Sequence, residues 1–266
     1  VTAYSTQKGG WSEELTGVFN VPVINDVLAF RVAASYKDKS GWIDQPATGA
    51  KDINNQELSN IRIAGLWQAS DKFSVKATAI QHRNEGGGPN FANFGSVADS
   101  NYRTAVDPTL SPGFTDDYDL YNLTASYEFN ATVLTSNSSY IDLDKARVGD
   151  SQFAIIPAFS STQETEILIF SIEESAQVFT QELRLNSEHN GPLTWTLGLF
   201  YSDMKRQQRS PEGGALRIGP VGPPLAAFPL PSENRASESI AYFADISYAI
   251  TDRLTIGIGT RYFDDQ

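Results

Sequence analysis

Few residues in this sequence combine the side-chain type and the spacing that catalysis or metal binding requires. The histidines are His82 and His189, and each could serve as a general base or a metal ligand. His82 falls late on an expected strand and His189 in an expected tight turn, so we expect them near opposite ends of the fold. The absence of cysteine excludes thiol catalysis and Cys-ligated metals. No Gly-x-Ser-x-Gly segment marks a nucleophilic serine, and we predict that the protein is not an enzyme.

Two short motifs match ligand-binding loops in composition only. Residues 86–88 are three glycines, but they lack the Gly-Lys-Ser/Thr ending and the following helix of a phosphate-binding loop, so a flexible loop is the favoured interpretation. Asp116, Asp117 and Asp119 could bind calcium through clustered carboxylates. Their spacing does not match an EF-hand, which favours a solvated acidic rim. The sequence predicts neither a metal site nor a cofactor.

The charge of the chain limits its partners. A net charge of −12 argues against binding to nucleic acid. Two segments differ in sign: residues 84–118 hold five carboxylates and one arginine, a net −4, whereas residues 204–237 hold five cations and two carboxylates, a net +3. The basic segment could attract an anionic ligand or contact lipopolysaccharide phosphates. An ordinary solvated loop is the favoured interpretation.

The elements that position these residues are indicated by hydrophobic alternation. From residue 193 to 201, Leu, Trp, Leu, Leu and Tyr occupy alternate positions, with Thr, Thr, Gly and Phe between them, as in a β-strand with two different faces. Mean hydropathy is only −0.30, and no uninterrupted apolar run is long enough to span a bilayer as a helix. A membrane β-barrel needs no such run, because only alternate residues face lipid.

The same alternation recurs along the chain in a regular cycle. Strands of about ten residues are joined alternately by tight turns and by loops of roughly 20 to 35 residues, so that all tight turns fall at one end and all long loops at the other. Residues 1–5 are the end of a strand, and residues 167–170 form a possible extra strand within a loop. The expected strands are 14–23, 27–37, 58–68, 73–83, 119–129, 132–142, 178–186, 193–201, 239–248 and 253–263, and the expected long loops are 38–57, 84–118, 143–176 and 204–237.

This asymmetry is typical of outer-membrane barrels, because long unstructured loops are uncommon in compact soluble domains. A soluble β-sandwich remains the alternative. Pattern alone does not decide which face of 132–142 points outward. In a barrel, the lumen-facing set is Arg31, Arg62, Lys76, Glu182 and Arg184, and the lipid-facing set is Leu28, Phe30, Val32, Tyr36, Ile61, Ile63, Trp67, Leu197, Leu199, Tyr242 and Ile246.

Several stretches also resemble the TonB-dependent outer-membrane receptors. They are residues 28–36 (LAFRVAASY) with 41–44 (GWID), 61–71 (IRIAGLWQASD), 180–185 (TQELRL), 195–201 (WTLGLFY) and 259–263 (GTRYF). The resemblance implies a barrel of about 22 strands closed by an N-terminal plug domain, located in the bacterial outer membrane. It further implies import of a scarce nutrient, such as a ferric siderophore, cobalamin or a saccharide, driven by the TonB complex.

We therefore expect an all-β, antiparallel meander of about 11 strands that forms roughly half of a transmembrane β-barrel. Residues 1–266 are expected to be a partial barrel domain without plug or C-terminal strands, left as an open sheet with edges near 1–5 and 253–263. Expected partners are outer-membrane lipid and lipopolysaccharide, the TonB complex through the plug, and a small nutrient ligand. A secreted soluble glycan-binding sandwich and an outer-membrane enzyme are the alternatives.

Candidate ligand-binding residues lie beside the glycine-rich segment, where aromatic side chains on a loop offer contact area: Asn90, Phe91, Phe94 and Tyr102.

Overall fold

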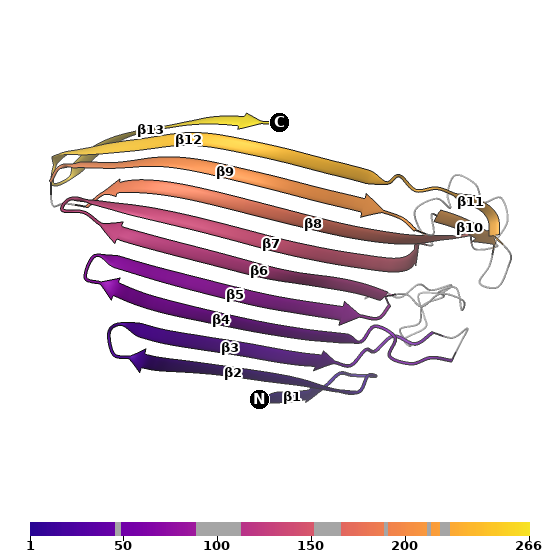
Figure 1. The fold of residues 1–266 in the computed structure, drawn as a ribbon. Helices are drawn as coiled ribbons and strands as arrows, with labels where there is room; N and C mark the ends of the chain where they lie inside the picture. Colours follow the sequence, from indigo (N-terminus) through magenta and orange to yellow (C-terminus); the bar gives the residue numbers. More distant parts are fainter. Residues whose placement is uncertain (46–48, 89–112, 152–165, 189–190, 212–213, 219–223) are drawn as a thin grey trace.

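The described part of the chain folds into one antiparallel sheet (Figure 1). The computed structural model describes residues 1–45, 49–88, 113–151, 166–188, 191–211, 214–218 and 224–266. No helix in these ranges has the length and apolar character needed to cross a bilayer. The strands are β1 (Thr2–Ser5), β2 (Trp11–Ile24), β3 (Leu28–Lys39), β4 (Gln56–Ser70), β5 (Phe73–Gly86), β6 (Gly113–Glu128), β7 (Thr132–Ser151), β8 (Glu166–Ser187), β9 (Leu193–Arg209), β10 (Gly214–Ile218), β11 (Pro224–Phe228), β12 (Glu233–Thr251) and β13 (Leu254–Asp265).

The strands pair in sequence order, as the alternation of tight turns and long loops predicts. The main path runs β1-β2-β3-β4-β5-β6-β7-β8-β9-β12-β13, and the hairpin β10–β11 leaves this path and pairs with β8 through β10. In Figure 1 the short turns lie at the left of the sheet and the longer connections at the right, with the two chain ends on opposite edges. The predicted meander of about 11 strands, open at the edges β1 and β13, is thus confirmed.

The strands are longer than the expected ten residues, and the predicted loops are correspondingly shorter. β7 has 20 residues and β8 has 22, so most of the predicted 143–176 loop belongs to these two strands. Residues 167–170 are therefore part of β8 and not a separate strand. Beyond the apolar region both faces of a hairpin are solvated, so backbone pairing continues although the hydrophobic alternation that marks a strand has ended.

The cross-strand register confirms the predicted division of side chains between two faces. In an antiparallel pair, directly opposed residues point to the same side of the sheet. Val32 is opposite Ile63 and Leu199 is opposite Tyr242, so large apolar side chains line up on what we call the apolar face. The predicted lumen set occupies the other side, which we call the polar face. Residues 132–142, left open by the sequence, place Leu134 on the apolar face, opposite Tyr127.

The apolar face is uncovered, which argues against the soluble sandwich. A sandwich buries such a face against a second sheet, but all described strands belong to a single sheet. Phe30 is 43% exposed and Leu199 48% exposed, and the buried apolar side chains among the described residues are few: Ile43, Ala176 and Ala241. Exposed apolar side chains on this scale require an apolar surrounding.

The connection between β3 and β4 folds back over the end of β5. Asn54 Oδ1 accepts hydrogen bonds from the backbone N–H groups of Trp42 (2.8 Å) and Ile43 (2.9 Å). Gly87 N–H donates to the carbonyl of Asn55 (2.9 Å), and a Cβ on Gly87 would lie 1.9 Å from the carbonyl oxygen of Ile53. The expectation of a flexible loop at residues 86–88 is therefore wrong, because glycine here permits close packing of two backbones.

Candidate functional site

The polar face carries an unexpected apolar row about midway along strands β5 to β9. Its five residues occupy one position on each of the adjacent strands β5 to β9, each directly opposite the next, and all are half-buried. Each breaks the polar alternation of its own strand, a signal that sequence reasoning missed because it becomes visible only after the strands are aligned. We call this set the apolar row: Ile80, Leu120, Ile141, Val178 and Met204.

Two rings continue this surface toward the long loops. The His82 and Tyr118 rings are stacked, with centroids 4.7 Å apart and planes 12° from parallel, and Tyr118 is directly opposite His82 on β6. His82 Nδ1 lies 2.6 Å from Asn60 Oδ1, so this hydrogen bond fixes the imidazole. A ring held by an amide and stacked on an aromatic neighbour offers fixed contact area to a ligand. His189 lies outside the described residues.

Ion pairs border the apolar row on the side of the long loops. Arg206 donates two hydrogen bonds to Glu174, at 3.1 Å from Nε and 3.0 Å from Nη2. Lys145 Nζ lies 3.6 Å from Asp116 Oδ1. The two hydrogen bonds to Glu174 fix the guanidinium group of Arg206 and neutralise its charge.

The predicted basic segment 204–237 is therefore not a uniform positive loop. Arg206 and Arg209 belong to β9, and Arg235 belongs to β12. Each is paired with a carboxylate: Arg206 with Glu174, Arg209 with Glu173 and Arg235 with Glu233. Paired charges produce a weaker long-range field, so steering of an anion by this segment is weaker than its net charge suggests.

The aspartates of residues 116–119 are partly exposed but do not gather in one cluster. They lie within β6, where alternate side chains point to opposite faces. Asp116 lies on the polar face, whereas Asp117 and Asp119 lie on the apolar face with Arg83, at 3.9 Å from Arg83 Nε and 2.9 Å from Arg83 Nη2. Within the described residues, no group of three or more acidic or histidine side chains is arranged to hold a metal ion.

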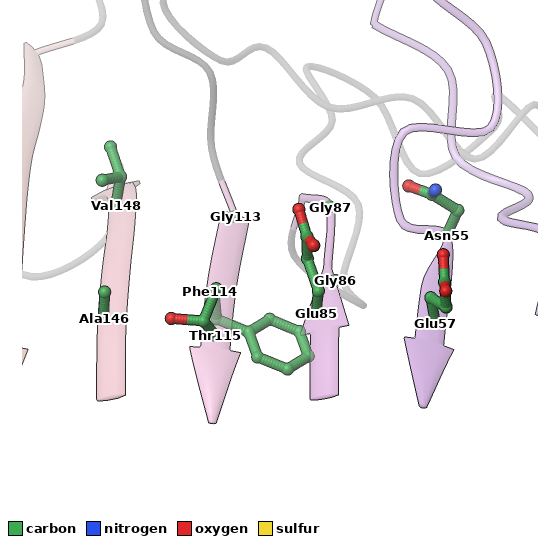
Figure 2. A pocket seen from close by; sticks show the side chains of 10 residues that line it. All are labelled: Asn55, Glu57, Glu85, Gly86, Gly87, Gly113, Phe114, Thr115, Ala146 and Val148. Atoms are coloured by element: carbon green, nitrogen blue, oxygen red, sulfur yellow. The ribbon is translucent and has the colours of Figure 1, made fainter. Parts of the chain in front are cut away.

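A cavity of about 450 Å³ lies at the long-loop end of β4 to β7. Figure 2 shows Glu57 and Glu85 on neighbouring strands, and the register places them directly opposite each other. The Phe114 ring lies against Gly86, where an added Cβ would meet Phe114 Cε1 at 2.3 Å. Two opposed carboxylates give this cavity a negative character, so it suits a cationic group better than an anion.

The predicted ligand-binding residues cannot be placed relative to these features. Asn90, Phe91, Phe94 and Tyr102 lie outside the described residues. The chain enters their segment from Gly88 and leaves it at Gly113, both at the long-loop end of the sheet, beyond His82 on β5 and Tyr118 on β6. The candidate site within the described residues is the apolar row together with His82 and Tyr118, which we call the row-and-ring surface.

Comparisons with known proteins agree with this geometry. A family model described as "TonB dependent receptor-like, beta-barrel" matches residues 15–266. A search of curated proteins gives no significant match.

Solved structures of similar fold include three receptors. The ferripyoverdine receptor of the Pseudomonas aeruginosa outer membrane has a TM-score of 0.73 at 13% identity, and the match covers 96% of this chain and 35% of that one. The ferric yersiniabactin uptake receptor of Yersinia pestis has a TM-score of 0.67 at 14% identity, covering 96% and 40%. The siderophore receptor PirA of Acinetobacter baumannii has a TM-score of 0.63 at 16% identity, covering 99% and 37%. The chain thus spans well under half the length of each.

Proposed function

Because the chain belongs to the TonB-dependent receptor family through its β-barrel domain, we propose that it forms part of the wall of an importer for a ferric siderophore. Proteins of this family lie in the outer membrane of Gram-negative bacteria, and so does this chain. The family is one of transport receptors and not a class of enzymes. Import of a scarce nutrient is the activity that this family and this location support. Import of a ferric siderophore is the more specific form that we propose.

The two faces of the sheet support this role. In a membrane barrel, alternate residues face lipid and lumen, so the apolar face is the lipid side and the polar face is the lumen. Barrels of this kind have short periplasmic turns and long extracellular loops. The row-and-ring surface therefore lies on the lumen wall about midway along the strands, with His82 and Tyr118 on its extracellular side.

The observation that carries the siderophore proposal is the alignment of five apolar side chains beside two stacked rings on a face where polar and charged side chains predominate. Stacked rings and an apolar row provide contact area for a bulky ligand with planar or apolar parts. The siderophores named for the similar structures are ferric chelates, which fits a ligand of this size and kind. A small, fully hydrated saccharide would gain less from the apolar row, because its hydroxyl groups would lose water without partners.

The further partners of the whole protein follow from the same proposal. Transport against a gradient needs energy, and the family obtains it from the TonB complex acting through a plug domain within the barrel. Lipopolysaccharide and other outer-membrane lipid are the proposed surroundings of the apolar face, and residues 1–266 are proposed as one partial barrel domain.

We expect Tyr118→Ser to weaken ferric siderophore binding by about tenfold, because the loss of the ring removes roughly 1–1.5 kcal/mol of stacking. The measurement is uptake of ⁵⁵Fe-loaded siderophores by cells that produce the full-length protein, with the dissociation constant determined by fluorescence quenching. Tyr121→Ser is the matched control, because Tyr121 lies on the same strand but on the apolar face. Equal losses in both variants, or no loss in either, would contradict the proposal.

The proposed loop contacts can be tested in the same assay. Replacing Phe91 and Phe94 together by alanine is expected to lower binding further, because aromatic side chains on an extracellular loop supply contact area at low entropic cost. Retention of full uptake and affinity by this double variant would remove both residues from the ligand site.

A further inference from the structure

The cations and the carboxylates of strands β3 to β5 are divided between the two faces of the sheet. The residues of these strands that alternate onto the polar face include Lys and Arg but no Asp or Glu. The carboxylates lie on the apolar face, where Glu57 is directly opposite both Asp38 and Glu85. In a chain with a net charge of −12, this part of the lumen wall is therefore positive. Its cations are Arg31, Lys37, Lys39, Arg62 and Lys76.

Two of these cations have no partner among the described residues. Lys37 is neutralised by Glu14, with Nζ 2.8 Å from Oε1, and two further cations donate hydrogen bonds to amide side chains. Within the described ranges, Arg62 and Lys76 form neither an ion pair nor a side-chain hydrogen bond, and both are exposed. They differ in this respect from the arginines of β9 and β12, which are engaged by carboxylates. The donors of the Arg62 guanidinium group are thus available to a ligand.

Arg62 borders the row-and-ring surface. It is directly opposite Ile80, so it continues the line of the apolar row onto β4. Asn60, which fixes the imidazole of His82, lies two residues away on the same face. His82 is therefore a diagonal neighbour of Arg62, about 7–8 Å away between backbones, which an arginine side chain can span. Lys76 adds positive charge about 13 Å from Ile80 along β5, toward the tight turns.

We propose that the row-and-ring surface, together with Arg62, selects a ferric catecholate. Three doubly deprotonated catechol rings outweigh the charge of one Fe³⁺, so this chelate is an anion whose negative oxygens lie on the edges of aromatic rings. It can present ring faces to Tyr118 and to the apolar row while its oxygens accept hydrogen bonds from the guanidinium group. The inference rests on the proposed function, whose ligand class it narrows.

Two other classes of ferric chelate match fewer of these groups. A trihydroxamate is neutral, because three singly deprotonated groups balance one Fe³⁺, so it gains no attraction from the unpaired charge of Arg62. A citrate-type chelate is anionic but has no ring face for Tyr118, and it would set polar groups against the apolar row. The catecholate combines the ring faces and the negative charge that this surface can recognise together.

The test compares chelates of different charge on the full-length protein. Dissociation constants are measured by fluorescence quenching for a ferric tris-catecholate, a neutral ferric trihydroxamate and ferric citrate. Arg62→Gln is expected to weaken catecholate binding about tenfold and trihydroxamate binding by less than about twofold. Arg62→Lys keeps the charge and is expected to retain catecholate affinity within about threefold. Arg253→Gln is the matched control, because Arg253 lies in the tight turn between β12 and β13, outside the lumen wall.

Salt dependence distinguishes recognition of charge from structural damage. Catecholate binding by the unchanged protein is expected to weaken as ionic strength rises, because salt screens the attraction between the chelate and the wall. Arg62→Gln is expected to make this dependence shallower. A variant that is merely damaged would bind more weakly at every salt concentration with the same dependence, and that result would overturn the proposal.

Further outcomes separate this inference from the proposed function. Equal losses for the charged and neutral chelates, or the same loss in Arg253→Gln, would contradict recognition of charge by Arg62. Unchanged catecholate affinity in Arg62→Gln, with a lower melting temperature in the absence of ligand, would mean that Arg62 contacts an acidic surface of the protein itself. Tighter binding of the trihydroxamate or of ferric citrate than of the catecholate would overturn the inference and leave siderophore import standing. Failure of the protein to bind any ferric chelate would refute both.

Discussion

Leu199→Arg is expected to lower the free energy of unfolding in a lipid bilayer by about 2–4 kcal/mol, because hydrocarbon cannot hydrate a guanidinium group near the middle of the membrane. Leu199 is 48% exposed on the apolar face, between Leu183 on β8 and Tyr242 on β12. Both flanking side chains are uncharged, so neither offers the introduced charge a partner. The measurement is equilibrium unfolding of the full-length protein by guanidinium chloride in lipid vesicles.

Ser202→Arg provides the matched control for this charge. Ser202 lies three residues further along β9, on the polar face, opposite Thr180 and Ser239. An arginine there projects into the watery lumen and is expected to change the free energy of unfolding by less than about 0.5 kcal/mol. A larger destabilisation at Ser202 than at Leu199 would mean that the two faces are assigned the wrong way round.

Gly87→Ala is expected to detach the connection between β3 and β4 from the end of β5. The added Cβ would lie 1.9 Å from the carbonyl oxygen of Ile53, and a backbone atom cannot rotate away as a side chain can. The hydrogen bonds from Gly87 to Asn55 and from Gly88 to Ile53 would then be lost. Two such bonds contribute about 1–3 kcal/mol together, so amide hydrogen exchange in residues 49–55 should accelerate roughly 10- to 100-fold.

Gly17→Ala serves as the control for this substitution. A Cβ on Gly17 would meet only the Phe19 ring, at the ordinary contact distance of 3.9 Å. Exchange in residues 49–55 is therefore expected to remain as in the unchanged protein. Unaltered exchange in Gly87→Ala would show that the connection is held by other contacts, foremost the burial of Ile43 and the hydrogen bonds accepted by Asn54.

The division into two faces could be predicted from the sequence because it depends on a period of two residues alone. Alternation on two separate strands predicts the same face for Val32 and Ile63, and the register places them directly opposite each other. Strand ends could not be predicted in this way. Outside the membrane both faces of β7 and β8 are wet, so nothing in the hydrophobic pattern distinguishes Lys145, in the middle of β7, from a loop residue.

The candidate site was harder to predict than the fold. Each member of the apolar row, such as Ile141, is a single break in the alternation of its own strand, and the breaks form a row only through a register that joins five strands. The stacking of His82 on Tyr118 depends on a neighbour 36 residues later in the chain. Pairing across a long loop is fixed by tertiary structure, so local sequence reasoning could not supply it.

The pairing of strands in chain order, with only the β10–β11 hairpin set aside from the main path, also determines the order in which the wall can assemble. Tight turns such as the one between β4 and β5 close hairpins at small entropic cost, so hairpins form first and then join side by side. Each hairpin that joins leaves one free strand edge, and that edge becomes the template for the next. Unpaired backbone groups cost several kcal/mol each in hydrocarbon, so a partly built wall must be kept from the bilayer interior, or held against another protein's strand, until its edges are paired. The topology therefore makes biogenesis a stepwise, template-directed process in which an insertion factor that presents a strand edge would act as a catalyst.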